Sequence, residues 1–142
     1  MNIKFKRLHP AARLPTYGSP DAACFDLYAV EPIEVGAFSS AVARTGIASE
    51  IPPGHAMLIY SRSGHGFKHG VRLANAVGVI DSDYRGEVAV ALRNDTGIPF
   101  DFDPGARLAQ ALVMPTERVE FIEVDSLSDT QRGDSGFGST GQ

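Results

Sequence analysis

Apolar residues along this chain come in short bursts that are rich in β-branched side chains. The bursts cover residues 42–47, 56–60, 87–92, 108–114 and 119–124, and turn-forming Pro, Asn, Asp and Gly residues lie between them at 52–54, 94–97 and 103–105. Bursts of this length and composition are typical of strands. No stretch of a dozen residues keeps a helical period. We therefore predict an all-β fold, a jelly-roll-like barrel or sandwich of many short strands.

Two further segments refine this prediction. Residues 75–87 form an apolar run that enters a polar turn, and the strand at 88–92 follows at once, so we expect a β-hairpin there. After residue 124 the composition changes to Asp, Ser and Thr, and from 133 to 141 glycine dominates. We predict a β domain over residues 1–125 and a flexible Gly-rich C-terminal arm over residues 126–142 that could close over a bound ligand.

Composition and charge narrow the classes of function. With 142 residues, 43% hydrophobic and 21% charged, the chain has the size and balance of one globular domain. Its formal charge of −4 argues against a broad nucleic-acid-binding surface. The chain has one cysteine and no apolar run that could act as a signal peptide or cross a bilayer. We expect a cytoplasmic protein with a small-molecule partner and no membrane contact.

Three segments carry candidate chemistry, and each one alone also fits a structural explanation. The polar turn from Asp81 to Tyr84 can be an ordinary turn. Arg62 lies in Ser-Arg-Ser-Gly at 61–64, where a hydroxyl and a glycine allow close approach to a phosphate, but the same letters occur in plain loops. The arm holds a cation, an aromatic and two hydroxyls that could close on a nucleotide, or it is simply a disordered terminus.

His65 and His69 are four residues apart but lack a third ligand and a zinc-protease helix, so we expect no zinc site.

Taken together, these segments resemble the five ordered motifs of the trimeric dUTP pyrophosphatases (dUTPases), with matching order and spacing from about residue 14 to residue 141. The matching stretches are residues 21–29, 61–64 with 68–71, 78–87, 107–110 and 132–141. The third and fifth are the most specific. The joint match outweighs the structural explanation of each segment alone.

The resemblance implies a jelly-roll subunit in a homotrimer, with active sites at subunit interfaces that are each completed by the arm of another subunit. It implies hydrolysis of dUTP to dUMP and pyrophosphate through attack of water on the α-phosphorus. Asp81 would be the general base. Mg²⁺ would bridge triphosphate oxygens, and Asp26 would act on the metal indirectly, through water.

The resemblance also implies a set of substrate-binding residues. Tyr84 would pack beneath the deoxyribose and exclude a 2′-hydroxyl, the segment from Asn75 to Tyr84 would read uracil, and Phe137 would stack on the base. The other positions would supply donors to the phosphates or backbone contacts. The full set is Arg62, Ser63, Gly64, Asn75, Gly78, Tyr84, Gln110, Arg132, Phe137, Gly138, Ser139 and Thr140.

The chain departs from the usual family pattern at a few positions. Cys24 with Phe25 stands where small residues are more frequent, Ser61 where proline is common, and His65 where leucine is frequent. Ser135 occupies a position often filled by glycine, so a positive φ there would cost on the order of 1 kcal/mol. None of these changes removes a reacting group.

Two other functions stay open on the sequence. One is dCTP deaminase, a sister enzyme with the same fold that uses a glutamate for acid–base chemistry on the base. The other is a nucleotide-sensing regulatory protein that binds dUTP without turnover. The intact segment from Asp81 to Tyr84 and the complete Gly-rich tail favour the hydrolase over the deaminase. Asp81 also argues against a pure sensor, which needs no base that activates water.

Overall fold

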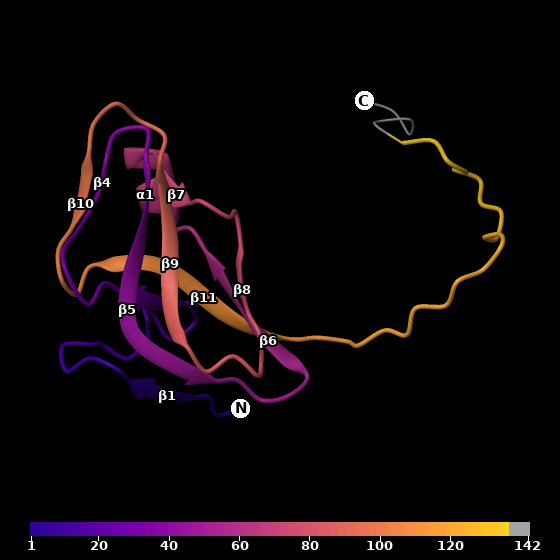
Figure 1. The fold of residues 1–142 in the computed structure, drawn as a ribbon, viewed down its shortest axis with the longest axis horizontal. Coiled ribbons are helices and arrows are strands. Elements are labelled where there is room, and N and C mark those ends of the chain that lie inside the picture. The colour runs from indigo at the N-terminus through magenta and orange to yellow at the C-terminus, as the bar shows by residue number, and fades with distance from the viewer. Residues whose placement is uncertain (137–142) are drawn as a thin grey trace.

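The computed structural model describes residues 1–136 and consists of two main antiparallel sheets that share one core, with a small two-stranded sheet at one end (Figure 1). The four-stranded sheet has the order β1 (Lys4–Arg7), β5 (Ser40–Glu50), β9 (Glu87–Asn94) and β7 (Val71–Leu73). The five-stranded sheet has the order β2 (Thr16–Tyr17), β3 (Phe25–Tyr28), β11 (Arg107–Pro115), β6 (His55–Tyr60) and β8 (Gly78–Ile80). The small sheet pairs β10 (Phe100–Phe102) with β4 (Ile33–Val35). The predicted all-β class is confirmed.

The core forms because alternate residues of each strand face inward. In β9 the side chains of Val88, Val90 and Leu92 are buried, whereas Ala89 between them is exposed. Leu27 of β3 and Met57 of β6 are fully buried on the opposing sheet and belong to the same cluster. This period of two is the pattern expected of strands with one face in the core.

Four of the five predicted strands are confirmed as β5, β6, β9 and β11, each with somewhat different bounds. The prediction of a strand at residues 119–124 is wrong, because no strand lies beyond Pro115 in the described part of the chain. The prediction of a hairpin over residues 75–92 is also wrong. β8 pairs with β6 in one sheet and β9 pairs with β5 and β7 in the other, so the polar turn at 81–86 connects the two sheets.

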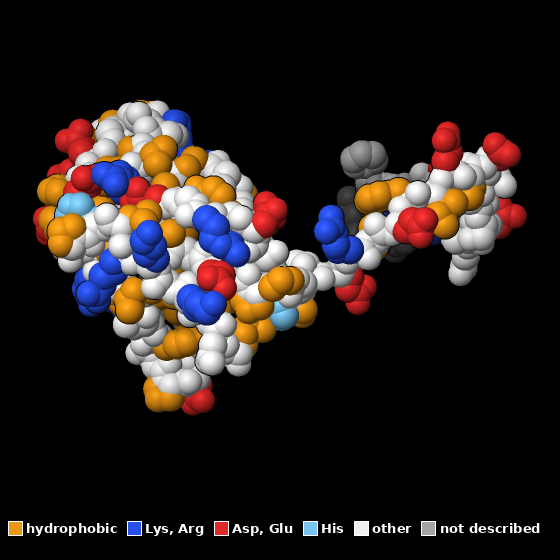
Figure 2. Space-filling view, turned by 60° about the horizontal axis from the view of Figure 1, so that its bottom comes forward, with side chains coloured by type: hydrophobic (Ala, Val, Ile, Leu, Met, Phe, Trp, Pro, Cys, Tyr) orange, Lys and Arg blue, Asp and Glu red, His pale blue; other side chains and the backbone are white. Residues whose placement is uncertain are grey.

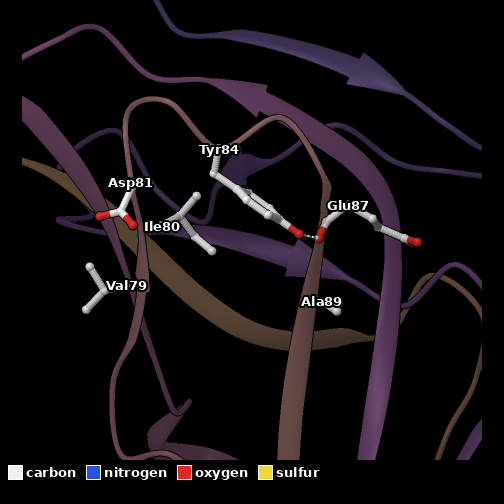
Figure 3. Close-up of a pocket in the computed structure, with 6 residues that line it drawn as sticks. All are labelled: Val79, Ile80, Asp81, Tyr84, Glu87 and Ala89. Atoms are coloured by element: carbon white, nitrogen blue, oxygen red, sulfur yellow. Dashed lines mark hydrogen bonds between the residues drawn. The ribbon is translucent and has the colours of Figure 1, made fainter.

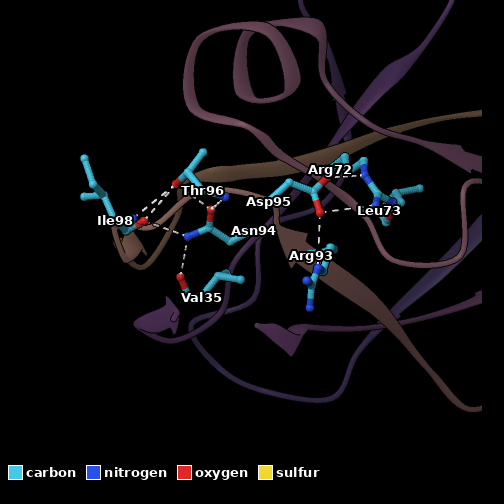
Figure 4. A network of polar contacts seen from close by, with 8 residues as sticks. All are labelled: Val35, Arg72, Leu73, Arg93, Asn94, Asp95, Thr96 and Ile98. Atoms are coloured by element: carbon cyan, nitrogen blue, oxygen red, sulfur yellow. Dashed lines mark hydrogen bonds and ion pairs between the residues drawn. The ribbon is translucent and has the colours of Figure 1, made fainter. Parts of the chain in front are cut away.

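A buried amide fixes the connection between β9 and β10. Asn94 has no exposed surface, and its Nδ2 donates to the carbonyl oxygens of Val35 at 3.0 Å and Ile98 at 2.7 Å (Figure 4). Its Oδ1 accepts from the backbone N–H of Thr96 at 2.9 Å and from the Thr96 hydroxyl at 2.8 Å. Both polar atoms of the buried Asn94 amide are thus paired, and the network holds β9 against β4 and sets the path of the chain into β10.

The described chain has one helix, α1 (Ser63–His69), which follows β6 directly and ends at Gly70 with φ of 63°. Seven residues are too few for a hydrophobic period to be recognised in sequence, which explains why α1 was not predicted. No helix in residues 1–136 is long and apolar enough to cross a membrane.

Beyond β11, residues 116–136 form what we call the C-terminal segment, which has no regular secondary structure. Figure 1 shows it leaving the end of β11 and running away from the sheets. Several of its large apolar side chains are exposed, and Figure 2 shows hydrophobic side chains on its surface, apart from the β domain. These side chains are Val119, Phe121, Ile122, Val124 and Leu127.

Candidate active site

The first cluster of predicted site residues surrounds the buried carboxylate of Asp26 on β3. Arg62, which follows β6, places its Nε 3.0 Å from Asp26 Oδ1, and Arg107 at the start of β11 places its Nη1 3.5 Å from Oδ2. The Arg62 Nε is buried and has no hydrogen-bond partner among the described residues. Its contact with Asp26 is therefore an ion pair without a directed hydrogen bond. Two guanidinium groups and one carboxylate leave this cluster with net positive charge, which suits an anionic ligand.

Sheet register brings Gln110 to the same place. Gln110 of β11 lies opposite Asp26 of β3 on one side and Tyr60 of β6 on the other. Its Nε2 donates to the carbonyl oxygen of Ser61 at 3.1 Å, which ties β11 to the loop after β6. Three segments far apart in sequence therefore meet at one end of the five-stranded sheet.

The loop after β6 is anchored by Ser61, which stands where the resembling family commonly has proline. The hydroxyl of Ser61 accepts the backbone N–H of Leu73 of β7 at 2.9 Å, a contact that a proline side chain could not make. Ser63 and Gly64 open α1 and are exposed to solvent, and a Cβ added at Gly64 would meet nothing within 4 Å. The Ser61 hydroxyl thus attaches the loop to the neighbouring sheet, while residues 62–64 stay accessible.

A second cluster lies at the turn between β8 and β9. Val79, Ile80, Asp81, Tyr84, Glu87 and Ala89 line a cavity of about 240 Å³ (Figure 3). In Figure 3 the Tyr84 ring reaches across from the turn toward β9, and the Asp81 carboxylate lies on the far side of Ile80. The Tyr84 hydroxyl donates to the Glu87 carbonyl oxygen at 3.1 Å. Asp81 itself is exposed, so a carboxylate and an aromatic wall are both accessible here.

Glu87 holds this turn against the four-stranded sheet. Its Oε1 accepts the backbone N–H of Gly46 at 2.7 Å, and its Oε2 accepts from Arg44 Nε at 3.0 Å. The register of β5 against β9 shifts between Arg44 and Ala48, so the carboxylate fills the irregularity that this bulge creates. Sequence reasoning did not select Glu87 as a site residue, because only the fold reveals that it faces the bulge.

Asn75 and Gly78 lie on the approach to the same turn. Asn75 is exposed, and the next residue, Ala76, has a positive φ of 61°, an uncommon conformation for a residue with a side chain. Gly78 begins β8, where an added Cβ would come within 3.2 Å of the Ile59 side chain. Close packing against β6 therefore favours glycine at this position.

The two clusters do not form one site within a single chain. Ile80, next to Asp81, pairs with Met57 near the start of β6, whereas Arg62 follows the end of β6. At roughly 3.3 Å per strand residue, the two clusters lie on the order of 15 Å apart along this strand. Asp81 and the Arg62 loop of one chain are therefore too far apart to contact the same small group.

The remaining predicted residues belong to the C-terminal arm. Arg132 is exposed, and its Nε donates to the carbonyl oxygen of Ser135 at 3.0 Å. Ser135 is not among the residues with positive φ in this structure. The predictions for Phe137, Gly138, Ser139 and Thr140 lie outside the described residues.

Arg107 is a second residue that the sequence prediction did not select. It lies within the fourth motif stretch, and its charge was the available signal, but its contact with Asp26 depends on the pairing of β11 with β3. Among residues 1–136 no group of three or more His, Cys, Asp or Glu side chains is placed to hold a metal ion. The described residues therefore offer cationic and amide hydrogen-bond donors but no protein metal cage.

Comparison with known proteins places this geometry in context. The dUTPase family model matches residues 11–141. A deoxyuridine 5′-triphosphate nucleotidohydrolase of Nautilia profundicola is 44% identical over 142 residues, covering 100% of both chains. A protein of the same name from Picosynechococcus sp. is 40% identical over 141 residues and covers 99% of both chains.

The solved structures that this chain resembles include dUTPases as well. A variant dUTPase of Staphylococcus bacteriophage 80alpha, solved with dUpNHpp, is 25% identical with a TM-score of 0.91 and covers 99% of each chain. A variant dUTPase of phage phi11 of S. aureus, whose structure reveals the coordination of a structural Mg(II) ion, is 22% identical with a TM-score of 0.82 and covers 89% of this chain and 98% of that one. At this level of identity the phi11 protein supports the fold alone.

Proposed function

This chain belongs to the dUTPase family, and on that premise we propose that it hydrolyses dUTP to dUMP and pyrophosphate by attack of water on the α-phosphorus. The observation that carries the proposal is the pair of complementary clusters at opposite ends of β6. One cluster offers cationic and polar donors, Arg62, Arg107 and Gln110, around Asp26. The other offers a carboxylate, Asp81, beside an aromatic wall, Tyr84.

A complete site then needs more than one copy of the chain. The Arg62 cluster of one copy would face the Asp81 cluster of a second copy, which removes the separation of the two clusters within a chain. A homotrimer gives three equivalent sites of this kind. The relatives named above carry the same family assignment, and the separation along β6 supports shared sites independently of them.

The C-terminal segment supports the same assembly. Val119, Phe121 and Val124 are 65%, 91% and 56% exposed, which is costly for apolar side chains unless another surface covers them. Residues 119–124 also have the composition of a strand and pair with no strand among residues 1–136. We expect this stretch to add as a strand to another copy, and the arm beyond it to close over that copy's site.

The proposed mechanism assigns distinct roles to the two clusters. Asp81 orients a water molecule and accepts its proton as the water attacks the α-phosphorus, so pyrophosphate leaves without a covalent intermediate. Arg62, Ser63 and Gly64 hold the triphosphate and stabilise the charge that develops on it, and Gln110, Arg132, Ser139 and Thr140 add donors. Positioning and charge stabilisation therefore supply most of the rate.

Magnesium fits this site as a substrate-bound ion. Both carboxylate oxygens of Asp26 already face guanidinium groups, so a contact through water suits Asp26 better than direct ligation. Mg²⁺ keeps several waters and is commonly held by phosphates with only one or two protein carboxylates. When bound, the ion would offset the charge of the triphosphate.

Specificity follows from the second cluster. The Tyr84 ring is fixed from both ends, by its backbone and by the hydrogen bond to the Glu87 carbonyl oxygen, so it forms a firm wall. Packed beneath the deoxyribose, this wall leaves no room for a 2′-hydroxyl. Phe137 would stack on uracil from the arm, while Asn75 and Gly78 would line the base.

The decisive test is release of pyrophosphate from dUTP, UTP, dTTP and dCTP with Mg²⁺, comparing wild type with Asp81→Asn. The amide keeps the size of the carboxylate and removes its basicity, so we expect turnover of dUTP alone and a loss of at least about 10²-fold in kcat in the variant. Asp83→Asn, in the same turn, is the matched control and should stay near wild type. Tight dUTP binding without turnover would instead indicate the regulatory protein, and ammonia release from dCTP would indicate the deaminase.

A further inference from the structure

His65 links the loop at 62–64 to β11, the two segments that carry the hydrogen-bond donors proposed to bind phosphate. It is the third residue of α1, and its backbone N–H donates to the carbonyl oxygen of Arg62 at 3.1 Å. Its side chain reaches the other way, and Nε2 lies 2.8 Å from the carbonyl oxygen of Arg107 on β11. A carbonyl oxygen can only accept, so Nε2 carries the proton and donates.

The Arg107 carbonyl is available because β11 is irregular at this point. The register of β11 against β3 shifts between Arg107 and Ala109, which interrupts the regular ladder of hydrogen bonds. His65 occupies the interruption. The leucine that is frequent at this position in the resembling family could fill the same space but could not donate a hydrogen bond.

Aromatic contacts fix the orientation of the imidazole. Its centroid lies 5.0 Å from that of Phe102 and 5.8 Å from that of Phe100, in both cases edge to face. Phe102 is buried, and the Asn94 network described above fixes the loop that leads into β10, the strand that carries both rings. The imidazole is therefore held on rigid elements rather than on a mobile loop.

Burial, and to a lesser extent the charge around His65, keep the imidazole in its neutral form. Burial lowers the pKa of His65; the hydrogen bond to the Arg107 carbonyl opposes this shift, and the positive charges of Arg62, His69 and Arg107 add to it. Protonation would place a further cation beside two guanidinium groups. At neutral pH the side chain acts as a fixed donor.

These contacts close a ring that joins the whole first cluster. Arg62 contacts Asp26, Asp26 contacts Arg107, and the Arg107 backbone receives the hydrogen bond from His65, whose own backbone returns to Arg62. We propose that His65 is a positioning residue that holds the phosphate-binding loop at 62–64 in register with β11, so that the donors of both segments reach the triphosphate together. This inference rests on the proposed function for the identity of the ligand.

The test compares side chains that differ in reach and in donor capacity. His65→Gln can extend an N–H to the Arg107 carbonyl, His65→Asn carries the same amide on a shorter side chain, and His65→Leu fills the space without a donor. His69→Leu, on the same helix, is the matched control. The ligands are dUpNHpp, measured by calorimetry with Mg²⁺, and deoxyuridine, measured by NMR titration because it lacks every phosphate.

We expect His65→Leu and His65→Asn to weaken dUpNHpp binding about fivefold to tenfold, the effect of losing roughly one net hydrogen bond. His65→Gln and His69→Leu should stay within about twofold of wild type, and deoxyuridine binding should be unchanged in all four. Assays of dUTP turnover should show the loss in KM more than in kcat.

Several results would overturn the inference. Equal dUpNHpp affinity in wild type, Leu and Asn variants would show that the hydrogen bond positions nothing. Equal losses for dUpNHpp and deoxyuridine would show a general structural defect. If His65→Leu fails to fold, the Gln and Asn pair still decides, since both carry the same polar group. Wild type that binds dUpNHpp but hydrolyses no dUTP would remove the proposed hydrolysis and leave the positioning role of His65 standing.

Discussion

The hydroxyl of Tyr84 donates to the carbonyl oxygen of Glu87 across Gly86, and this arrangement leaves no space for a side chain between them. A Cβ added at Gly86 would lie 2.4 Å from the Tyr84 hydroxyl oxygen and 2.6 Å from the ring carbon that bears it. Glycine is needed here for close approach, since Gly86 is not among the glycines with positive φ. The wall proposed to exclude ribose thus depends on the absence of a methyl group.

Gly86→Ala should therefore reduce discrimination against UTP. The methyl group forces Tyr84 to rotate away, and we expect the ratio of kcat/KM for dUTP to that for UTP to fall by at least about tenfold. Gly36→Ala is a suitable control, because its Cβ would make an ordinary 3.6 Å contact with the Ser39 side chain. An unchanged ratio in Gly86→Ala would mean that Tyr84 does not set the choice of sugar.

Removing the buried amide of Asn94 should destabilise the whole domain. Asn94→Ala removes the amide partner of the Val35 carbonyl oxygen and of the Thr96 backbone N–H and opens a cavity, while the Thr96 hydroxyl and the Ile98 carbonyl oxygen keep their bond to each other. We expect a loss of roughly 2–4 kcal/mol in the free energy of unfolding. Urea denaturation followed by circular dichroism measures it, and a loss below about 1 kcal/mol would show that water replaces the amide.

The exposed apolar side chains of the C-terminal segment predict how assembly responds to substitution. Phe121→Ser removes a side chain that we expect another copy to bury. Burial of such a side chain contributes about 1.5–3 kcal/mol to the free energy of association. The assembly should then dissociate at higher protein concentrations than wild type, as light scattering over a dilution series would show. Glu120→Ser is the neighbouring control and should leave the assembly intact. A wild-type chain that stays monomeric at all concentrations would exclude shared active sites.

The lowered pKa of His65 predicts a dependence of stability on pH. The folded pKa lies below the unfolded value of 6.5, so as pH falls through that value the unfolded chain binds a proton that the folded chain does not. The contribution of His65 is therefore full above pH 6.5 and is lost as pH falls toward the folded pKa. Glu50 and Asp95, whose pKa values are lowered by Lys4 and Arg72 respectively, lose their contributions only in a more acidic range.

We therefore expect thermal unfolding of wild type to shift downward between about pH 7.5 and pH 5.5, and the shift to be smaller in His65→Leu. The difference between the two proteins isolates the imidazole, because all other groups are shared. Equal shifts would show that His65 has the same proton affinity in the folded and unfolded chains.

Local patterns in the sequence predicted the four longest strands, whereas the candidate reacting groups were named through the family resemblance. Alternation of apolar and polar residues depends only on neighbours along the chain, which explains why β5, β6, β9 and β11 were correctly predicted. The turn after Ile80 was also visible as a change of composition. The pairing partners of β8 and β9, the strands on either side of this turn, were not visible. Turn residues show that the chain changes direction but not which strand each neighbouring strand pairs with.

The prediction of a strand at residues 119–124 failed for a related reason. The segment has the composition of a strand, but a strand forms only where an edge is available for pairing, and no described residue of the same chain supplies one. Sequence reports the preference of a segment and says nothing about where its partner lies.

By itself, then, the sequence determined the all-β class, the family resemblance and the candidate residues, since strand alternation and motif spacing are written along the chain. Only the tertiary structure decided that Asp26, Arg62 and Arg107 meet, that Asp81 lies at the other end of β6, and that His65 joins α1 to β11. The physical reason is that these contacts depend on sheet register and on bulges, where a shift of a single residue moves a side chain to the opposite face.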